Sequence, residues 1–168
     1  METIFLSLGA NVGDRERNIA RAIEKLPEHG IHVVRRSSLY ETEPVEFLDQ
    51  HWFLNCVVEA KTDLGPPQLL NALLQIERSL GRERFAPKGP RAIDIDILFF
   101  GSEVIQMPQL KIPHPRMADR KFVLVPFAEI APSTLHPLSR KTIAELLVET
   151  PDNSDVRLWK GTSDKPKA

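Results

Sequence analysis

Two aspartates lie two residues apart in a segment that otherwise has the apolar pattern of a β-strand. Asp94 and Asp96 alternate with isoleucines in the run 93–97. Because successive strand side chains point to opposite faces, both carboxylates are expected on one face, with Cα atoms roughly 6.5 to 7 Å apart. Mg²⁺ prefers oxygen ligands and commonly takes one or two carboxylates together with substrate phosphates. The spacing therefore predicts a nucleotide-phosphate site that contains hard cations.

The same alternation is also typical of a half-buried strand whose polar side chains face water. Asp is depleted in strands, however, and two carboxylates on one face repel each other unless cations compensate. Basic residues precede this strand at Arg82, Arg84, Lys88 and Arg91. Guanidinium groups suit phosphate oxygens, so a basic loop facing two carboxylates favours phosphoryl transfer, with a solvated basic loop as the alternative. The sequence has neither a glycine-lysine phosphate loop nor a kinase glycine loop, so any nucleotide site is unconventional.

Two further groups of residues could bind a ligand. Phe53 and Asn55 are expected on one face of another strand, where a ring and an amide suit a flat heterocycle. A hydrogen bond to a neighbouring loop explains Asn55 equally well. His114 follows the acid-bearing strand in a Pro-His-Pro-Arg motif, with Arg120 nearby. This histidine could donate to a phosphate or have only a structural role.

The elements that must position these residues follow the order β-α-β-β-α-β. Apolar periodicity and turn residues predict a strand over 4–8, a helix over 15–26 capped by Asp14, strands over 31–40 and 53–61, a helix over 66–80, and the strand that carries the acids. This order predicts an α+β fold, a ferredoxin-like antiparallel sheet with both helices on one face. An extra hairpin over 104–112 and C-terminal helices within 116–130 and 142–148 are expected to pack on it.

Length and composition indicate one soluble globular domain. The chain has 168 residues, 42% of them hydrophobic and 27% charged, with a formal net charge of -1. We expect a single domain over 1–155 and a polar C-terminal tail over 156–168. The near-neutral charge gives no general attraction to nucleic acid or to a membrane surface. Cys56, the sole cysteine, is expected to be buried in a reducing compartment, and the sequence shows neither a signal peptide nor a membrane span, so a cytoplasmic monomer is expected.

Four motifs occur in order within roughly residues 3–150. They are SLGANVGD at 7–14, YETEP at 40–44 with FLN at 53–55, GPRAIDIDIL at 89–98, and IPHPR at 112–116. As a set they resemble the 6-hydroxymethyl-7,8-dihydropterin pyrophosphokinase family of folate biosynthesis, and several motifs in order are far more specific than any one. The chain departs from many relatives at Lys88, where they carry Trp.

The resemblance implies that ATP donates its β,γ-diphosphate to the pterin hydroxymethyl oxygen and leaves as AMP. Asp94 and Asp96 would hold two Mg²⁺ ions on the triphosphate, with Asp96 also a candidate for orienting or deprotonating the attacking hydroxyl. The implied catalytic residues are Arg82, Arg91, Asp94 and Asp96. The implied ATP contacts are Glu77, Arg84, Ile97, Leu110, His114 and Arg120. The implied pterin contacts are Thr42, Val45, Phe53, Asn55 and Phe122.

Other classes of function remain compatible with the sequence. A relative that binds pterin or nucleotide with weakened catalysis would keep the same motifs. A metal-dependent nuclease could use the two aspartates. A ferredoxin-like sheet can also bind RNA, although the chain has no aromatic-rich ribonucleoprotein signature and no basic excess. Small-molecule substrates are therefore expected, without nucleic acid or membrane as partners.

Overall fold

The structure is a computed structural model that describes residues 1–43, 52–81 and 92–161. Its elements are β1 (Glu2–Ala10), α1 (Arg15–Lys25), the 3-10 helix η1 (Pro27–His29), β2 (Ile31–Arg36), β3 (Tyr40–Thr42), β4 (Phe53–Thr62), α2 (Pro66–Ser79), β5 (Asp94–Phe100), β6 (Ile105–Met107), β7 (Leu110–Ile112), the 3-10 helix η2 (Met117–Asp119), α3 (Lys121–Ile130), α4 (Ile143–Glu149) and β8 (Val156–Leu158). None of the helices in these ranges is long and apolar enough to cross a membrane.

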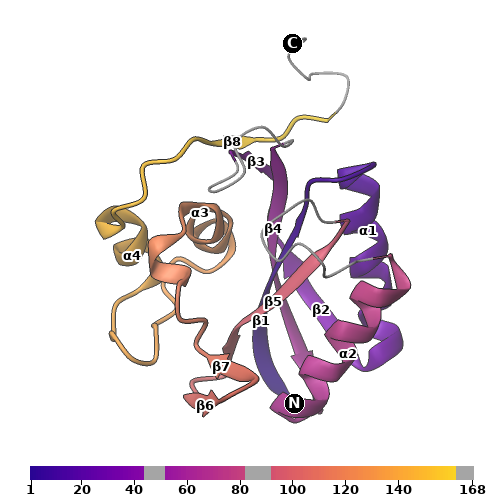
Figure 1. Ribbon diagram of the computed structural model, residues 1–168. Helices are drawn as coiled ribbons and strands as arrows, with labels where there is room; N and C mark the ends of the chain where they lie inside the picture. Colours follow the sequence, from indigo (N-terminus) through magenta and orange to yellow (C-terminus); the bar gives the residue numbers. More distant parts are fainter. Residues whose placement is uncertain (44–51, 82–91, 162–168) are drawn as a thin grey trace.

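The main sheet has the strand order β5-β1-β4-β3-β8, and β2 also pairs with β4. All of these pairings are antiparallel. Helices α1 and α2 cover one face of the sheet, as expected, and α3 and α4 lie on the other side (Figure 1). The predicted hairpin forms a separate two-stranded sheet of β6 and β7. The α+β, ferredoxin-like prediction is therefore confirmed, with the C-terminal helices as an added layer.

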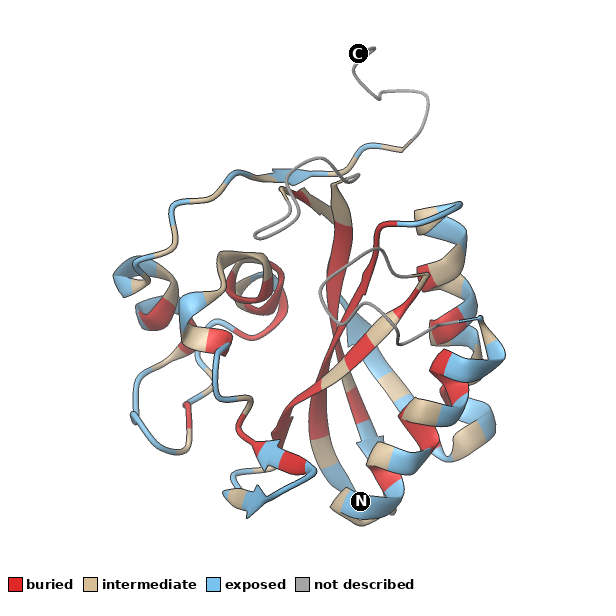
Figure 2. Cartoon of the chain, viewed as in Figure 1, coloured by how far each residue is buried: buried red, intermediate tan, exposed pale blue. Residues whose placement is uncertain are grey.

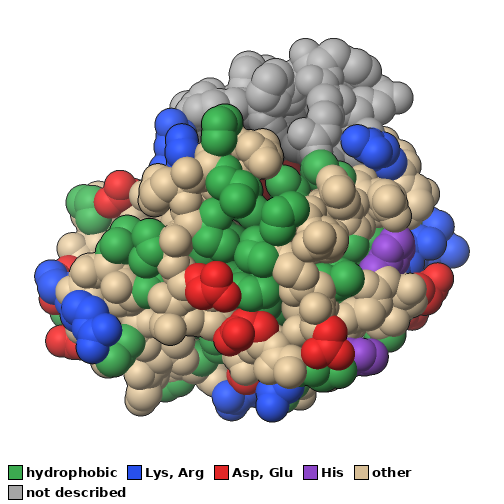
Figure 3. Space-filling view, turned by 90° about the horizontal axis from the view of Figure 1, so that it is seen from below, with side chains coloured by type: hydrophobic (Ala, Val, Ile, Leu, Met, Phe, Trp, Pro, Cys, Tyr) green, Lys and Arg blue, Asp and Glu red, His purple; other side chains and the backbone are tan. Residues whose placement is uncertain are grey.

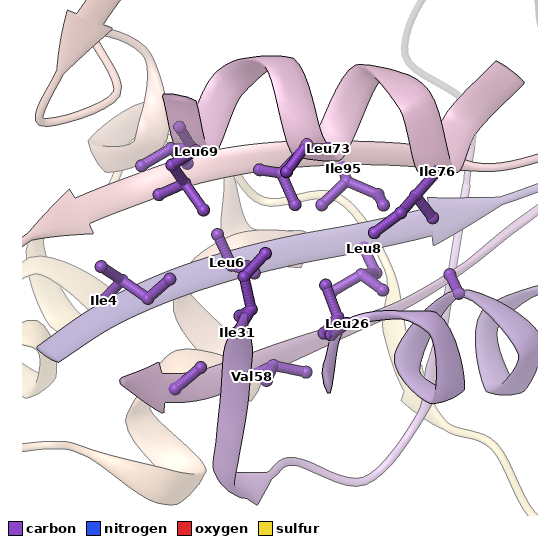
Figure 4. Packing of buried hydrophobic residues seen from close by; sticks show 14 of the residues in the cluster. Ile4, Leu6, Leu8, Leu26, Ile31, Val58, Leu69, Leu73, Ile76 and Ile95 are labelled. Carbon is purple, nitrogen blue, oxygen red and sulfur yellow. The ribbon is translucent and has the colours of Figure 1, made fainter. Parts of the chain in front are cut away.

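The first hydrophobic core lies between the sheet and helices α1 and α2. Alternate residues of β1 point into it, and Leu69, Leu73 and Ile76 of α2 lie over the sheet (Figure 4). Figure 2 shows that the central strands are buried along most of their length. Full burial of one such side chain contributes about 1.5 to 3 kcal/mol, so this layer fixes which face of each strand points toward α2.

A second core fills the space between the sheet and α3. The rings of Phe5 and Phe127 have centroids 4.7 Å apart, and those of Phe99 and Phe127 are 5.2 Å apart. A bulge between β1 and β5 pairs Phe5 with Phe99 and the next residue, Leu6, with Ile97. Leu98 is the extra residue, so Leu98 and Phe99 both belong to this second core. Because of the bulge, Phe99 at the C-terminal end of β5 and the two aspartates at its N-terminal end all lie on the side of the sheet that faces α3.

The strand predicted over 31–40 is two strands. Ser37 interrupts it because its side chain takes over strand hydrogen bonds: its Oγ accepts from Val57 N at 2.9 Å and donates to Ser38 O at 2.7 Å. The chain then resumes pairing with β4 as β3. A serine that bonds locally to the backbone competes with the regular ladder, which explains the break.

Part of the polar tail predicted over 156–168 forms regular structure. Residues 156–158 form β8, which pairs with β3. Trp159 packs against the first core, and its backbone N–H donates to Leu39 O at 2.8 Å. Residues 162–168 lie outside the described ranges, and the division of the chain into a domain over 1–155 and a tail stays a prediction.

The described surface carries charges of both signs. In the space-filling view from below, acidic and basic side chains both surround a group of apolar ones (Figure 3). This mixture agrees with the formal net charge of -1. The described part of that face therefore lacks the single-sign basic field that favours nucleic-acid binding.

Candidate active site

A strip of site residues crosses the sheet on the side that faces α3. Asp94 on β5 lies opposite Gly9 on β1, and Gly9 lies opposite Asn55 on β4. Asp94 and Asp96 face the α3 side because the isoleucines between them belong to the core under α2. Two strand spacings separate Asp94 from Asn55, which places their Cα atoms roughly 10 Å apart. The strip therefore joins a pair of carboxylates to an amide within the length of a small substrate.

Asn55 is held in one orientation by its neighbours. Its side chain is buried, and Nδ2 donates to Thr42 Oγ1 at 2.8 Å. A Cβ atom built on Gly9 would lie only 2.5 Å from Asn55 Oδ1. This close approach requires glycine at position 9. The sequence predicted that the first strand ends before Gly9, but β1 continues through Ala10, and a glycine inside a strand is a usual sign of such an approach.

The acid-bearing strand is fixed from behind by a buried carboxylate. Glu77 of α2 is 3% exposed, and its Oε2 accepts a hydrogen bond from Ile95 N at 2.8 Å. Ile95 lies between the two aspartates, so this bond sets the position of the backbone that carries them. Asp94 and Asp96 are themselves half-buried, beside Gly9 and Ser7 on β1. Two carboxylates on one face supply the hard oxygen donors that Mg²⁺ requires, and this donor set fits that ion.

His114 lies next to β5 as a neutral imidazole. Its backbone N–H donates to Leu98 O at 3.1 Å, which holds the following segment along the strand. Burial, with Arg120 and Arg116 nearby, lowers the pKa of His114 to about 4, against a smaller opposite effect of Asp94. Nδ1 accepts a hydrogen bond from Arg116 N at 3.2 Å. The ring proton is therefore on Nε2, where it can be donated to an anionic ligand.

The start of α3 adds a cation and an aromatic ring. The guanidinium carbon of Arg120 lies 5.6 Å from the ring centroid of Phe122. Phe122 packs against the edge of the second core, so its position is set by that core. Phe53, at the start of β4, lies on the α3-facing side of the sheet with Asn55, two residues further on. The ring of Phe53 therefore comes from the sheet, and the ring of Phe122 comes from helix α3, which covers that face of the sheet.

The structure separates the predicted nucleotide contacts into two groups. His114 is close enough to Arg120 and Asp94 for the charges of both to affect its pKa, and these three residues form the first group. Glu77, Ile97 and Leu110 lie on the α2 side, where Ile97 and Leu110 belong to the first core. Among the described strands β5 is the edge of the main sheet, so a ligand can reach both groups only across that edge.

The remaining predicted site residues lie outside the described ranges. These are Val45, Arg82, Arg84 and Arg91.

Sequence comparison links the chain to one family. The model of the family described as 7,8-dihydro-6-hydroxymethylpterin-pyrophosphokinase matches residues 5–132. The chain is 44% identical over 160 residues to the 2-amino-4-hydroxy-6-hydroxymethyldihydropteridine pyrophosphokinase of Bacillus subtilis, covering 95% of this chain and 91% of that protein. It is also 44% identical over 149 residues to the protein of the same name from Aquifex aeolicus, covering 89% and 92% of the two chains.

Other similar proteins are much longer. The chain is 43% identical over 152 residues to the folic acid synthesis protein fol1 of Pneumocystis carinii, which is 90% of this chain but 20% of that protein. The crystal structure of Plasmodium falciparum HPPK-DHPS with pteroate matches with a TM-score of 0.72 and 19% identity, covering 88% of this chain and 42% of that one, which shows a shared fold. The family match and both bacterial relatives cover most of the chain, and this chain belongs to the 7,8-dihydro-6-hydroxymethylpterin-pyrophosphokinase family.

Proposed function

We propose that this protein transfers diphosphate from ATP to 6-hydroxymethyl-7,8-dihydropterin, giving AMP and the pterin diphosphate for tetrahydrofolate synthesis. The observation that carries the proposal is the strip in which Asp94, Gly9 and Asn55 lie on neighbouring strands. In this strip, the carboxylate proposed to bind the metal ions and phosphates lies next to the amide proposed to bind the heterocycle. Family membership and the names of the full-length bacterial relatives support the same reaction.

In the phosphate half, Asp94 and Asp96 would hold two Mg²⁺ ions against the triphosphate. Bound there, the ions would neutralise phosphate charge, as divalent cations do in phosphoryl transfer. Asp96 would also orient the attacking hydroxyl or accept its proton. Arg82 and Arg91, outside the described residues, are proposed to neutralise the transferring diphosphate.

In the nucleotide half, the neutral ring of His114 would donate from Nε2 to a phosphate oxygen, and Arg120 would supply a permanent positive charge beside it. The rest of the nucleotide would pass over the edge of β5 toward Ile97 and Leu110. Glu77 would act there by fixing the β5 backbone, which it already does through Ile95 N. Arg84, outside the described residues, is the remaining proposed ATP contact.

In the pterin half, the heterocycle would stack between Phe53 from the sheet and Phe122 from α3. Asn55 would read its polar edge through the amide that Thr42 and Gly9 hold in place. Val45 is the remaining proposed pterin contact and lies outside the described residues. This division predicts that pterin and nucleotide depend on different side chains of one continuous site.

We propose that the protein acts as a cytoplasmic monomer on small molecules, without nucleic acid or membrane as partners. The formal net charge of -1 and the mixed charges on the described surface support the absence of nucleic-acid and membrane partners. A pterin-binding relative with weakened catalysis, a metal-dependent nuclease and an RNA-binding module are the competing functions that the test must separate.

The test is nucleotide product analysis after incubation with ATP, Mg²⁺ and 6-hydroxymethyl-7,8-dihydropterin. We expect AMP that appears only when pterin and Mg²⁺ are both present, without ADP. Plasmid cleavage in a parallel reaction would favour the nuclease, and a gel shift at moderate salt would favour the RNA-binding module. A folded protein that binds ATP and pterin but makes no AMP would contradict the proposed activity.

A further inference from the structure

The C-terminal strand β8 lies at the opposite edge of the main sheet from the acid-bearing strand. Between β8 and β5 lie β3, β4 and β1. β8 pairs with β3 and sets Val156 opposite Thr42. Thr42 in turn accepts the hydrogen bond from the amide of Asn55. The short strand β3 is therefore held between the amide-bearing strand and β8.

Arg157, in the middle of β8, contacts the neighbours of two proposed pterin contacts. Its guanidinium carbon lies 4.3 Å from the ring centroid of Trp52, the residue before Phe53. Its Nη2 is 3.5 Å from Oε1 of Glu41, the residue before Thr42. A guanidinium at this distance from an indole ring is attracted to it electrostatically. The Arg157 side chain thus contacts both the residue before β4 and the middle residue of β3.

A second arginine completes this arrangement from α1. Arg15 Nη1 donates to Trp52 O at 2.7 Å and lies 2.9 Å from Glu41 Oε2. Its guanidinium carbon is 5.0 Å from the ring centroid of Trp159, just beyond β8. The Glu41 and Arg15 side chains are each only 12% exposed. Glu41 is therefore shared between two guanidinium groups, one from α1 and one from β8.

These contacts lie on the opposite side of the sheet from the strip. Glu41 precedes Thr42 in β3, and successive strand residues point to opposite faces, so Glu41 points toward α1 while Thr42 points toward Asn55. Arg157 therefore does not line the strip itself. Whatever it contributes there must pass through the backbone of Glu41 and Trp52.

We propose that Arg157 is a positioning residue for the dihydropterin half of the site. It holds Trp52 and Glu41 from behind, so that Phe53 and Thr42 keep the positions that the heterocycle needs. This role rests on the proposed function, because it names a support for the pterin contacts of that reaction. The nucleotide contacts lie at the other edge of the sheet, so loss of Arg157 weakens pterin binding selectively.

A purely structural role is separable from this one. The Arg157 side chain is 47% exposed, and exposed ion pairs contribute little to global stability. Arg35 provides a matched control: its side chain is 56% exposed, and its Nε lies 2.8 Å from Oε1 of Glu59 on β4. Arg35 lies on β2, which pairs with β4, and Arg157 lies on β8, which pairs with β3. Each forms an ion pair with a largely buried glutamate. Of these two arginines, Arg157 contacts neighbours of the pterin residues and Arg35 does not.

The experiment compares full-length wild type, Arg157→Ala, Arg157→Lys and Arg35→Ala. Pterin binding is titrated by fluorescence with a non-hydrolysable ATP analogue present, and KM values are measured for both substrates. We expect Arg157→Ala to raise the pterin Kd and KM about 5- to 20-fold and to change the ATP KM less than twofold. Arg157→Lys should recover part of the loss, since it keeps the charge but not the planar group. Arg35→Ala should match wild type.

The outcomes distinguish the two proposals. Wild-type pterin affinity in a folded Arg157→Ala variant, or equal losses for ATP and pterin, would overturn the positioning role alone. Should Arg157→Ala not fold, Arg157→Gln takes its place, because it removes the charge but keeps a polar side chain, and unchanged pterin affinity in that variant would also overturn the positioning role. A wild-type protein that binds pterin but forms no AMP would overturn the proposed activity and leave the binding comparison intact.

Discussion

Gly9 determines how close two strands of the site can bring their side chains. Asn55 Oδ1 occupies the space that a Cβ atom at position 9 would fill, at 2.5 Å from that point. The amide is also fixed by Thr42, so it cannot move away without breaking a buried hydrogen bond. The proposed pterin-reading amide therefore depends on a residue that itself has no side chain.

Gly9→Ala is expected to displace the Asn55 amide and to raise the pterin Kd at least 10-fold, with a smaller effect on ATP. The physical reason is the steric conflict with Asn55 Oδ1, because a real Cβ does not approach an oxygen so closely. Fluorescence titration with each ligand measures the two constants. Asn55→Ala should show the same selectivity.

Gly65→Ala is the control for that substitution. Its Cβ would lie 2.6 Å from Gln68 Oε1, a similar short contact, but Gln68 is exposed and can move. We expect unchanged binding of both ligands. If the Gly9→Ala and Gly65→Ala variants bind pterin equally well, the steric conflict with Asn55 does not affect pterin binding. The Asn55 amide is then not a pterin contact.

Asp94→Asn and Asp96→Asn test the acid pair. Each keeps the shape of the side chain but removes a negative charge that the proposed Mg²⁺ ions require. We expect each to lower kcat by about 100-fold or more, a loss comparable with removing one preorganised electrostatic contact. AMP formation at saturating ATP and pterin is the measurement, with circular dichroism to confirm the fold.

Asp63→Asn is the matched control for the acid pair. Asp63 follows β4, and its carboxylate is 77% exposed and 3.5 Å from the N-terminal amine. Its loss should leave turnover within twofold of wild type. Wild-type turnover in either folded site variant would remove the aspartates from the metal site.

At the scale of elements, the N-terminus of α3 depends on a residue far away in sequence. Asp152 Oδ2 accepts from Lys121 N at 2.8 Å, and Oδ1 accepts from Ser154 N at 2.9 Å. Burial raises the pKa of Asp152, but these hydrogen bonds outweigh it and lower the pKa overall. The segment after α4 thus caps the helix that presents Phe122.

Asp152→Ala is expected to destabilise the protein by about 1 kcal/mol, the usual effect of losing a helix cap, and to lower Tm by roughly 2 to 4 °C. Thermal unfolding by circular dichroism measures the shift. Asp119→Ala, an exposed aspartate just before Arg120, should unfold at the wild-type temperature. An unchanged Tm for Asp152→Ala would mean that α3 needs no cap from this segment.

The elements that sequence patterns predicted well are those with local signals. Helix α1 begins after Asp14, whose side chain accepts from Arg17 N, and both the cap and the periodicity are visible in the sequence. The break at Ser37 and the strand β8 were missed. Each depends on partners far away in the chain, Val57 for Ser37 and β3 for β8. Local patterns do not encode such partners.

At the scale of the molecule, the sheet is buried on both faces, and this decides where function is possible. The α2 side is closed by aliphatic side chains along most of the strands. On the α3 side the second core fills one end, and the strip of Asp94, Gly9 and Asn55 occupies the other. The bulge at Leu98 interrupts the alternation of side chains along β5. It therefore allows the second core and the strip to lie on the same face of the sheet.

The sequence predicts Asp94 and Asn55 as site residues but not their arrangement on either side of Gly9. The alternation around Asp94 placed the acids on one face, and the structure agrees. The adjacency of Asp94 to Asn55 through Gly9 depends on strand order and register, which no local pattern contains. The sequence therefore predicts a strand that ends before Gly9, whereas in the structure Gly9 lies between Asp94 and Asn55.

His136 is one source of pH-dependent stability outside the site. The ring packs edge-on against Phe99 at 5.6 Å, and Nδ1 accepts from Leu138 N and Ser139 N. Burial lowers the pKa of His136 below its usual 6.5. The unfolded chain then binds a proton at a higher pH than the folded one does, so stability is full above about pH 6.5 and falls as pH decreases toward the folded pKa.

His136→Asn is expected to reduce this acid sensitivity, because the amide oxygen can accept the same two hydrogen bonds without titrating. Wild type should lose more Tm between pH 7.5 and pH 5.5 than the variant does. The difference is bounded by about 1.4 kcal/mol per pH unit for one proton. Equal losses in the two proteins would show that His136 does not contribute.

The most direct test of the account follows the β-phosphate of ATP. The enzyme is incubated with Mg²⁺, 6-hydroxymethyl-7,8-dihydropterin and ATP labelled at the β-phosphorus, and the pterin product and nucleotides are then separated. Diphosphate transfer across the Asp94 to Asn55 strip predicts that the label leaves with the pterin while unlabelled AMP accumulates. Label that stays with ADP, or no labelled pterin at all from a folded enzyme, would contradict it.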